Sequence, residues 1–392
     1  MYIDEETNPS SKIMEMYEGE KMEYRKLEKL GISTSLLGYG CMRFPLKEDQ
    51  TIDEELAQEL LDKALASGVT YLDTAYIYHN QQSESFLGKA LAKYNRDSYY
   101  LATKLPVWMV KETKDVRMYF EEQLRRLNTD HIDFYLFHSL DKEKWEQIKK
   151  LNMIAEVEKL REEGKINYIG FSFHDEYPVF EEILTYRDWD FCQMQLNYVD
   201  TVIQQGMKGY ELTEKLGIPV VIMEPIKGGT LSKLPDVMEN VFHQVNPEAS
   251  ISSWALRYVA SLPNVKVVLS GMTEMYQLED NLKTFGNFKK LSPEEMEAVE
   301  KVTKIYRSRQ LNECTACGYC MPCPFGVNIP GNFKICNQGS IYENLSGAKE
   351  KYSQMDEGKR ASACQECGAC EPLCPQSITI IEDLKKVQIA LG

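Results

Sequence analysis

The chain has 392 residues, of which 43% are hydrophobic, so it can bury one large core and still form a small second domain. Its formal net charge of −15 argues against nucleic-acid binding, which requires a basic surface that releases counterions from phosphates. No run of about 18 apolar residues occurs, and the acidic N-terminal segment has no apolar signal region. We therefore expect no membrane span and a cytoplasmic location.

Short apolar runs alternate with longer amphipathic segments after an N-terminal stretch, residues 1–21, that shows no clear periodicity and is expected to form an extension. In chain order the runs are "TSLLGYG", "VTYLDTA", "YYLATKLP", "IDFYLFHS", "INYIGFS", "FCQMQLN", "VVIME" and "VKVVLSG". Runs that are this short and nearly unbroken by charge are typical of strands buried on both faces. The sequence therefore predicts a parallel sheet.

The segments between these runs have helical periodicity. Leu56, Leu60 and Ala64 fall on one helical face, and Thr51 followed three residues later by Glu54 predicts a capping box at the start of that helix. A last helix is expected over about residues 293–308. Eight strand–helix repeats favour a (β/α)8 TIM barrel over a doubly wound sheet, and no G-x-G-x-x-G follows the first run. We predict an α/β barrel domain over residues 22–308.

Four polar side chains follow consecutive predicted strands. Asp73, Lys104 and His138 lie at strand ends, and Tyr78 lies in the loop after the second strand. Each has an ordinary explanation, because an Asp often caps a helix, a Lys is often solvated and a loop Tyr often packs. In a barrel, however, the carboxyl ends of the strands meet at one face, where functional residues gather. The coincidence of all four favours a shared site.

Together these four residues have the chemistry of a proton-donating site for a carbonyl. A tyrosine hydroxyl titrates near pH ~10, which makes it a weak acid at neutral pH. We expect the Lys104 ammonium to favour the phenolate and so to lower the pKa of Tyr78. Asp73 would keep Lys104 charged and in place, and His138 would hydrogen-bond and orient the substrate oxygen.

The motifs "YLDTAYIYHN", "SESFLGKAL", "LATKLP", "RRLNTDHIDFYLFH", "YIGFS" and "QMQLNY", in this order and spacing, resemble the aldo-keto reductase superfamily over about residues 23–290. The resemblance implies a (β/α)8 barrel that reduces carbonyls with NAD(P)H and without a metal. It also implies that Tyr78 is the general acid, that Lys104 and Asp73 tune it, and that His138 orients the carbonyl.

The same resemblance implies a set of cofactor contacts at the ends of later strands. They comprise two residues at the nicotinamide amide, one beside the nicotinamide ring, four near the pyrophosphate and four at the adenosine end: Ser172 and Gln193; Met223; Pro225, Ile226, Lys227 and Gly229; Ser270, Gly271, Gln277 and Asn281.

Two features depart from the family pattern. Met223 stands where many relatives place an aromatic residue on the nicotinamide ring. Gly271, Met272 and Gln277 stand where NADP-selective relatives carry Lys, Ser and Arg that pair with the 2'-phosphate. Because a phosphate here lacks charge-assisted partners, we expect NADH to bind at least as well as NADPH.

Eight of the 11 cysteines crowd into the last fifth of the chain, in the runs "CTACGYCMPCP" and "CQECGACEPLCP". In a large chain without a signal, such runs indicate metal binding in a reducing cytoplasm. Separated C-x2-C pairs would suit structural zinc, which is the alternative. Triplets of cysteines followed by a fourth before Pro are instead typical of [4Fe-4S] clusters. We predict a small ferredoxin-like domain over residues 309–392.

In such a pattern, the fourth cysteine of each run ligates the cluster of the other run. One predicted cluster is held by Cys314, Cys317, Cys320 and Cys374, and the other by Cys364, Cys367, Cys370 and Cys323. Cys336 is expected to be a buried apolar side chain. The chain as a whole resembles aldo-keto reductases with a C-terminal ferredoxin-like domain, a subgroup common in anaerobes.

The resulting functional hypothesis is a cytoplasmic oxidoreductase. Hydride passes between NAD(H) or NADP(H) and a small carbonyl or alcohol, while two [4Fe-4S] clusters exchange electrons with a redox partner protein. A hydride carries two electrons, whereas a cluster carries one. Three alternatives would resolve this mismatch: a flavin binds without a visible motif, the clusters only stabilise the fold, or the barrel performs one-electron chemistry.

Two other hypotheses remain open. One is a ferredoxin-type reductase that uses Tyr78 as the proton donor and cluster electrons without nicotinamide. The other is a non-enzymatic electron-transfer subunit on a vestigial barrel. The intact set of four polar residues counts against the non-enzymatic hypothesis.

Overall fold

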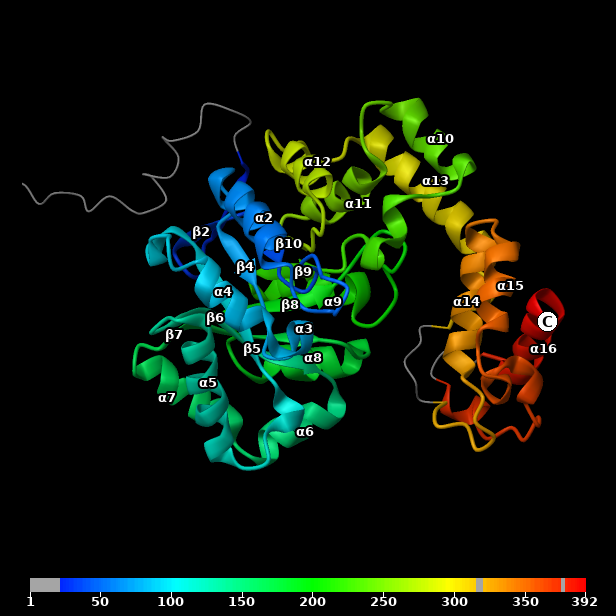
Figure 1. The fold of residues 1–392 in the computed structure, drawn as a ribbon, viewed down its shortest axis with the longest axis horizontal. Helices are drawn as coiled ribbons and strands as arrows, with labels where there is room; N and C mark the ends of the chain where they lie inside the picture. Colours follow the sequence, from blue (N-terminus) through cyan, green and yellow to red (C-terminus); the bar gives the residue numbers. More distant parts are fainter. Residues whose placement is uncertain (1–21, 315–319, 375–377) are drawn as a thin grey trace, which may run out of the picture. The chain divides into compact units, whose positions relative to one another are not determined.

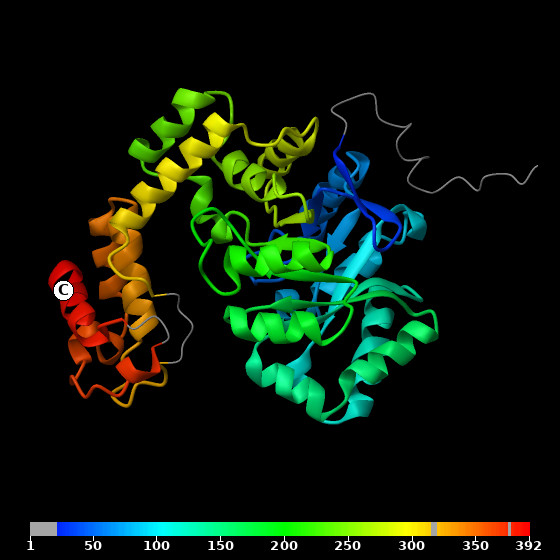
Figure 2. The same cartoon turned by 180° about the vertical axis from the view of Figure 1, so that it is seen from behind.

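The structure is a computed structural model that describes residues 22–314, 320–374 and 378–392. By packing, the chain divides into two compact units: residues up to 231 together with 252–292, and residues 232–251 together with 293–392. Figures 1 and 2 show the chain from opposite sides. In the part of the chain that the structure describes, no helix is long and apolar enough to cross a membrane.

The first unit is built around a closed barrel in which neighbouring strands run parallel (Figure 1). Each of the predicted apolar runs overlaps one of its strands, so the predicted barrel is confirmed. The barrel strands are β3 (Leu37–Gly40), β4 (Tyr71–Asp73), β5 (Tyr100–Leu105), β6 (Ile132–Leu140), β7 (Ile166–Phe173), β8 (Phe191–Gln195), β9 (Val220–Met223) and β10 (Val265–Ser270). β10 pairs with β3 and closes the barrel.

Large apolar side chains fill the barrel interior. The Phe134 ring lies 5.0 Å from those of Tyr71 and Phe191. A Cβ on Gly170 would come within 2.6 Å of the Phe191 ring, so a glycine at this position makes room for that ring. An antiparallel hairpin, β1 (Tyr24–Leu27) and β2 (Ile32–Ser35), precedes the barrel and adds Leu27 to the interior cluster. The sequence analysis did not predict this hairpin.

Helices connect the strands of the first unit: α2 (Glu54–Ala66), α3 (Tyr78–Gln81), α4 (Ser83–Ala90), α5 (Thr113–Leu127), α6 (Lys142–Lys150), α7 (Met153–Glu162), α8 (Tyr177–Tyr186), α9 (Gly206–Leu216), α11 (Ile251–Ala260) and α12 (Met275–Phe285). The predicted start of α2 is wrong. Its N-cap is Asp53, whose carboxylate accepts from the Leu56 amide at 3.3 Å, while the Thr51 hydroxyl donates to Asp49 in the preceding turn. Leu56 is exposed rather than buried on the apolar face.

The second unit is helical and has its own core. Its helices are α10 (Asp236–Val245), α13 (Pro293–Arg309), α14 (Ile329–Ile341), α15 (Leu345–Ser353) and α16 (Ile380–Leu391). The bounds of α13 confirm the predicted last helix. Val327, Phe333, Tyr352 and Leu384 are buried in this core, and Cys336 is buried with them, as predicted. The predicted domain boundary near Ser308 lies at the end of α13 and stays a prediction.

Candidate active site and cysteine pocket

The four predicted catalytic side chains come from three adjacent strands and the segment that follows the first of them. Asp73 ends β4, Lys104 lies near the end of β5 and His138 lies near the end of β6, while Tyr78 is the first residue of α3. β5 pairs in parallel with both β4 and β6. The closed barrel therefore gathers the four residues at one rim, and Asp73, Lys104 and His138 are all buried there.

Lys104 and Asp73 form a buried ion pair. The Lys104 ammonium donates to both Asp73 carboxylate oxygens, at 2.7 and 2.8 Å, and to the Thr74 carbonyl at 2.7 Å. Burial opposes the charged form of Lys104, but the Asp73 carboxylate and Tyr78 outweigh this effect and raise the pKa of Lys104. Lys104 is therefore a fixed positive charge across the neutral pH range.

The Tyr78 ring lies beside this charge, with the Lys104 ammonium 4.9 Å from the ring centroid. Burial raises the pKa of Tyr78, whereas Lys104 lowers it through its charge and a hydrogen bond, and the net pKa is raised. The expected influence of Lys104, which lowers the pKa, is therefore present, but burial outweighs it. Tyr78 stays protonated at neutral pH, which is the state a proton donor needs, and Lys104 stabilises the phenolate once the proton has left.

His138 lies between two aromatic rings, with its centroid 6.0 Å from that of Tyr78 and 5.2 Å from that of Trp108. Burial, together with Lys104, lowers the pKa of His138 well below its ordinary value, so the imidazole is neutral. Its Nδ1 is buried without a hydrogen-bond partner among the described residues. A neutral ring can donate a hydrogen bond from one nitrogen to a substrate oxygen.

The backbone around His138 is irregular. The register between β6 and β7 shifts between Phe137 and Leu140, and Ser139 has a φ of 55°. The Ser139 amide donates to the Ser172 hydroxyl oxygen at 2.7 Å. A bulge of this kind turns a side chain from its regular strand direction, here at the residue that faces Tyr78. Trp108 was not predicted, and its only sequence signal is an aromatic residue shortly after a strand end.

The residues assigned to the nicotinamide amide lie opposite each other on β7 and β8, where Ser172 pairs in register with Gln193. The Gln193 amide nitrogen lies 3.6 Å from the Met223 sulfur, and its buried Oε1 has no partner among the described residues. An orphaned acceptor beside a hydroxyl fits a carboxamide, which needs both an acceptor for its NH2 group and a donor for its oxygen. The residues present therefore fit the nicotinamide amide.

The loop after β9 carries Pro225, Ile226, Lys227 and Gly229. Lys227 pairs with the Asp200 carboxylate, which also accepts from Asn197 at 3.0 Å and from Gln195 at 3.2 Å. The sequence analysis did not identify Asp200. The Lys227 charge near the assigned pyrophosphate position is therefore already paired within the protein.

The residues assigned to the adenosine end make contacts among themselves. Asn281 donates to the Ser270 hydroxyl at 2.8 Å. The Gln277 side-chain oxygen accepts from the Thr273 amide at 2.8 Å and forms part of the capping box of α12 with Glu274. The three-residue spacing of Glu274 and Gln277 is the sequence signal for this capping box. A Cβ on Gly271 would lie 2.5 Å from the Arg43 side chain, so Arg43 packs over Gly271.

In the second unit, Cys323, Cys364, Cys367 and Cys370 line one pocket. Apolar side chains, including Val327, Ile329, Ile381 and Leu384, complete its wall. The structure thus brings together the four cysteines that the sequence analysis assigned to one cluster. Each iron of a [4Fe-4S] cluster takes one cysteine thiolate, so four cysteines around one pocket are the number that one cluster needs.

The other predicted cluster is described only in part. Cys314, Cys320 and Cys374 are half-buried against the core of the second unit. Cys317 lies outside the described residues.

Comparisons with known proteins identify the family of each part of the chain. Residues 36–304 match the aldo/keto reductase family, and residues 313–379 match a 4Fe-4S dicluster domain. The chain is 26% identical over 321 residues to the uncharacterized oxidoreductase YqkF of Bacillus subtilis, covering 74% of this chain and all of that protein.

Solved structures show the same likeness. The holo form of the aldo-keto reductase AKR11C1 from Bacillus halodurans is similar with a TM-score of 0.61 and 27% identity, covering 72% of this chain and 96% of that one. The thermostable aldo-keto reductase Tm1743, solved with the inhibitor epalrestat, has a TM-score of 0.60 and 26% identity, covering 72% of this chain and all of that one. The chain therefore belongs to the aldo/keto reductase family of oxidoreductases and carries a C-terminal 4Fe-4S dicluster domain.

Proposed function

We propose that the barrel interconverts a small-molecule carbonyl and the corresponding alcohol with NAD(H) or NADP(H), and that Tyr78 supplies the proton. The observation that carries this proposal is the buried Lys104–Asp73 pair next to Tyr78. Burying two charges costs free energy that is recovered only when their geometry is well satisfied. The fixed Lys104 ammonium lies beside the protonated Tyr78 phenol, and this arrangement is suited to stabilising a developing phenolate.

When bound, the nicotinamide supplies the hydride. Ser172 and Gln193 would hold its amide, and Met223 would lie beside its ring. The neutral His138 donates a hydrogen bond to the carbonyl oxygen and orients it, while Trp108 packs against His138. Tyr78 gives its proton to the same oxygen, so the carbonyl gains one hydride and one proton and becomes an alcohol. Lys104 stabilises the phenolate until solvent returns the proton.

We further propose that the cysteine domain holds two [4Fe-4S] clusters that exchange electrons with a redox partner protein. The pocket lined by Cys323, Cys364, Cys367 and Cys370 supports one ligand set, and Cys314, Cys317, Cys320 and Cys374 make the other. Thiolates of this kind persist in a reducing compartment, which is why we place the protein in the cytoplasm.

A second candidate function is carbonyl reduction by cluster electrons without a nicotinamide. It is favoured by the contacts of the assigned cofactor residues, because Lys227 pairs with Asp200 and Gln277 caps α12. To bind a cofactor, Lys227 would have to leave Asp200 and Gln277 would have to leave its place in the α12 cap. Otherwise the cofactor would bind without the Lys227 charge and the Gln277 amide.

Titration of the anaerobically purified protein with NADH and NADPH separates the two candidates. We expect NADH to bind at least as tightly as NADPH at moderate salt, since Gly271, Met272 and Gln277 offer no cation to a 2'-phosphate. Gln193→Leu should weaken NADH about 5- to 20-fold, the loss of one hydrogen bond to a buried group.

If neither nucleotide binds, the hydride-transfer proposal fails and carbonyl reduction by cluster electrons is the candidate that remains. A clear preference for NADPH would contradict the expectation for the adenosine end. Arg43→Ala would then show whether the side chain that covers Gly271 supplies the cation.

A further inference from the structure

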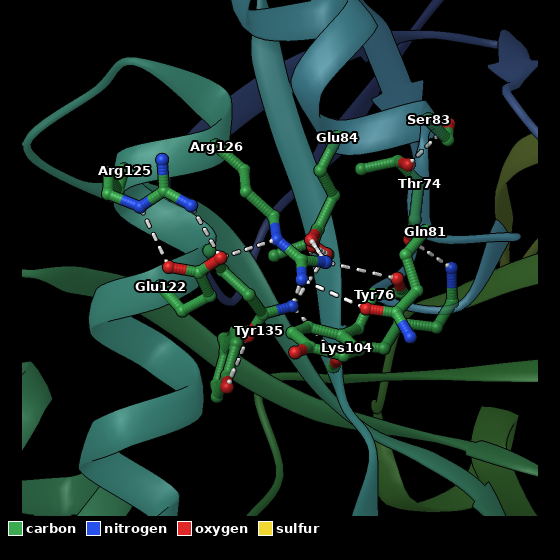
Figure 3. A network of polar contacts seen from close by, with 12 residues as sticks. Thr74, Tyr76, Gln81, Ser83, Glu84, Lys104, Glu122, Arg125, Arg126 and Tyr135 are labelled. Carbon is green, nitrogen blue, oxygen red and sulfur yellow. Dashed lines mark hydrogen bonds and ion pairs between the residues drawn. The ribbon is translucent and has the colours of Figure 1, made fainter.

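The buried carboxylate of Glu84, in α4, stands at the centre of a polar network that the proposed reaction does not use (Figure 3). The side chain is fully buried. Its Oε1 accepts from the Thr103 hydroxyl and from the Gln123 amide nitrogen, both at 2.7 Å, and its Oε2 pairs with Arg126 at 3.4 Å. Glu84 therefore joins α4, β5 and α5 at one point.

One branch of this network reaches the strand that carries Lys104. The Gln123 amide nitrogen donates to the Lys104 carbonyl at 3.0 Å, and the Tyr135 hydroxyl donates to the Gln123 side-chain oxygen at 2.8 Å. Thr103 is the residue before Lys104 on β5. The contact of Glu84 with Thr103 and the contact of Gln123 with the Lys104 carbonyl therefore fix the backbone from which the Lys104 ammonium extends.

The other branch reaches the segment that carries Tyr78. The Arg126 guanidinium donates to the Tyr76 carbonyl at 3.4 Å and to the Gln81 side-chain oxygen at 3.0 Å. It also lies 4.0 Å from the centroid of the Tyr76 ring. Arg126 therefore holds residues on both sides of Tyr78, as Figure 3 shows for Tyr76 and Gln81.

The Tyr78 segment needs this support. His79, Asn80 and Gln81 all have positive φ, at 50°, 52° and 70°, so three successive non-glycine residues adopt the left-handed conformation. Such residues each cost about 1–3 kcal/mol and persist only where the surroundings fix them.

The packing of α4 on α5 brings Glu84 and Arg126 together. A Cβ on Gly88 would lie 2.2 Å from the Arg126 carbonyl oxygen, so only a glycine allows this approach. Gly88 and Glu84 both belong to the "SESFLGKAL" motif, for which the catalytic site alone gives no reason.

We propose that Glu84 and Arg126 are positioning residues that hold the Tyr78 segment against the Lys104 strand. This proposal rests on the proposed function in one respect, that Tyr78 is the proton donor. A charged network in this place costs desolvation, and burial indeed raises the pKa of Glu84. An apolar contact would pack α4 on α5 equally well. It would not, however, supply hydrogen bonds that connect the Tyr76 carbonyl with the strand that carries Lys104.

Glu84→Gln tests the proposal with little change in shape. The amide keeps an acceptor for Thr103 and Gln123 but presents an NH2 group to Arg126. The substitution therefore breaks only the link from Glu84 to Arg126, which keeps its ion pair with Glu122 at 2.9 Å. We expect kcat to fall about 10- to 100-fold, the cost of a small misplacement of a reacting group. The KM for the nicotinamide should stay unchanged, and the solvent isotope effect on kcat should rise because proton transfer becomes slower.

Arg126→Lys is the second variant, since it keeps the charge but loses the planar fork that reaches Tyr76 and Gln81. We expect the same pattern from it. Lys114→Gln, in the first turn of the same helix α5, is the control. Lys114 pairs with Glu112 at the surface, at 2.8 Å, so this variant should behave like the native enzyme.

A readout without substrate separates this proposal from the proposed reaction. With 13C-labelled tyrosine, the Tyr78 resonance is the one that disappears in Tyr78→Phe, and at neutral pH it should shift in Glu84→Gln but not in Lys114→Gln. If the resonance shifts but the native protein transfers no hydride, the positioning role stands and the reaction fails. An unchanged resonance, with unchanged isotope effects in Glu84→Gln, would overturn the positioning role.

Discussion

Tyr78→Phe should lower kcat for carbonyl reduction by about 10²- to 10⁴-fold while leaving folding and NADH binding intact. The substitution removes only the hydroxyl that carries the transferable proton, because the ring that packs against His138 and Lys104 remains. Single-turnover rates of NADH oxidation with a panel of aldehydes and ketones measure the effect. Tyr186→Phe, an exposed tyrosine on α8, is the matched control and should retain the native rate.

The pH dependence adds a signed test of the same residue. Because burial raises the pKa of Tyr78 above its ordinary value, the acid is protonated throughout the neutral range. Reduction should therefore be independent of pH near neutrality and fall only as the pH rises toward that raised pKa. Alcohol oxidation, which needs the phenolate, should increase in the same direction. If Tyr78→Phe retains more than about a tenth of the native rate, Tyr78 is not the acid.

Cys323→Ser should remove the cluster held by Cys364, Cys367 and Cys370, although it lies in the other cysteine run. The pocket places these four sulfurs together, and a serine cannot replace a thiolate on iron. Anaerobic native protein should contain about eight iron atoms per chain, and the variant about four. Iron analysis and low-temperature electron paramagnetic resonance after dithionite reduction measure both quantities.

Two comparisons make that result specific. Cys374→Ser should damage the other cluster, and Cys336→Ala should keep all the iron because Cys336 is buried in the core of the second unit. If Cys323→Ser instead removes the same signal as Cys314→Ser, each run ligates its own cluster. Zinc in place of iron would refute the ferredoxin interpretation, and iron that dithionite does not reduce would indicate structural clusters.

The barrel was predictable because its strands are buried on both faces, which leaves almost uninterrupted apolar runs in the sequence. The hairpin β1–β2 was missed because "YRKL" and "ISTS" are short and largely polar. The predicted capping box failed for a local reason. The Thr51 hydroxyl bonds within its own turn to Asp49, a competition that residue spacing does not reveal.

The catalytic rim was predictable to the extent that strand ends determine it. Asp73, Lys104 and His138 lie at the carboxyl ends of adjacent strands, so the fold alone brings them together. The partners that come from helices and later loops, such as Trp108 and Asp200, depend on packing between distant segments. The net direction of the Tyr78 pKa shift could not be predicted, because burial, which the sequence does not report, outweighs the lowering by Lys104.

The central claim is that the barrel transfers hydride from a nicotinamide to a carbonyl carbon. The most direct measurement supplies anaerobic protein with NADH stereospecifically deuterated at C4 and a carbonyl substrate, and locates deuterium in the alcohol by mass spectrometry and NMR. The account predicts one deuterium on the former carbonyl carbon with one of the two C4 epimers and none with the other. Alcohol that forms without deuterium from either epimer, or that forms equally well with dithionite and no nicotinamide, would contradict it.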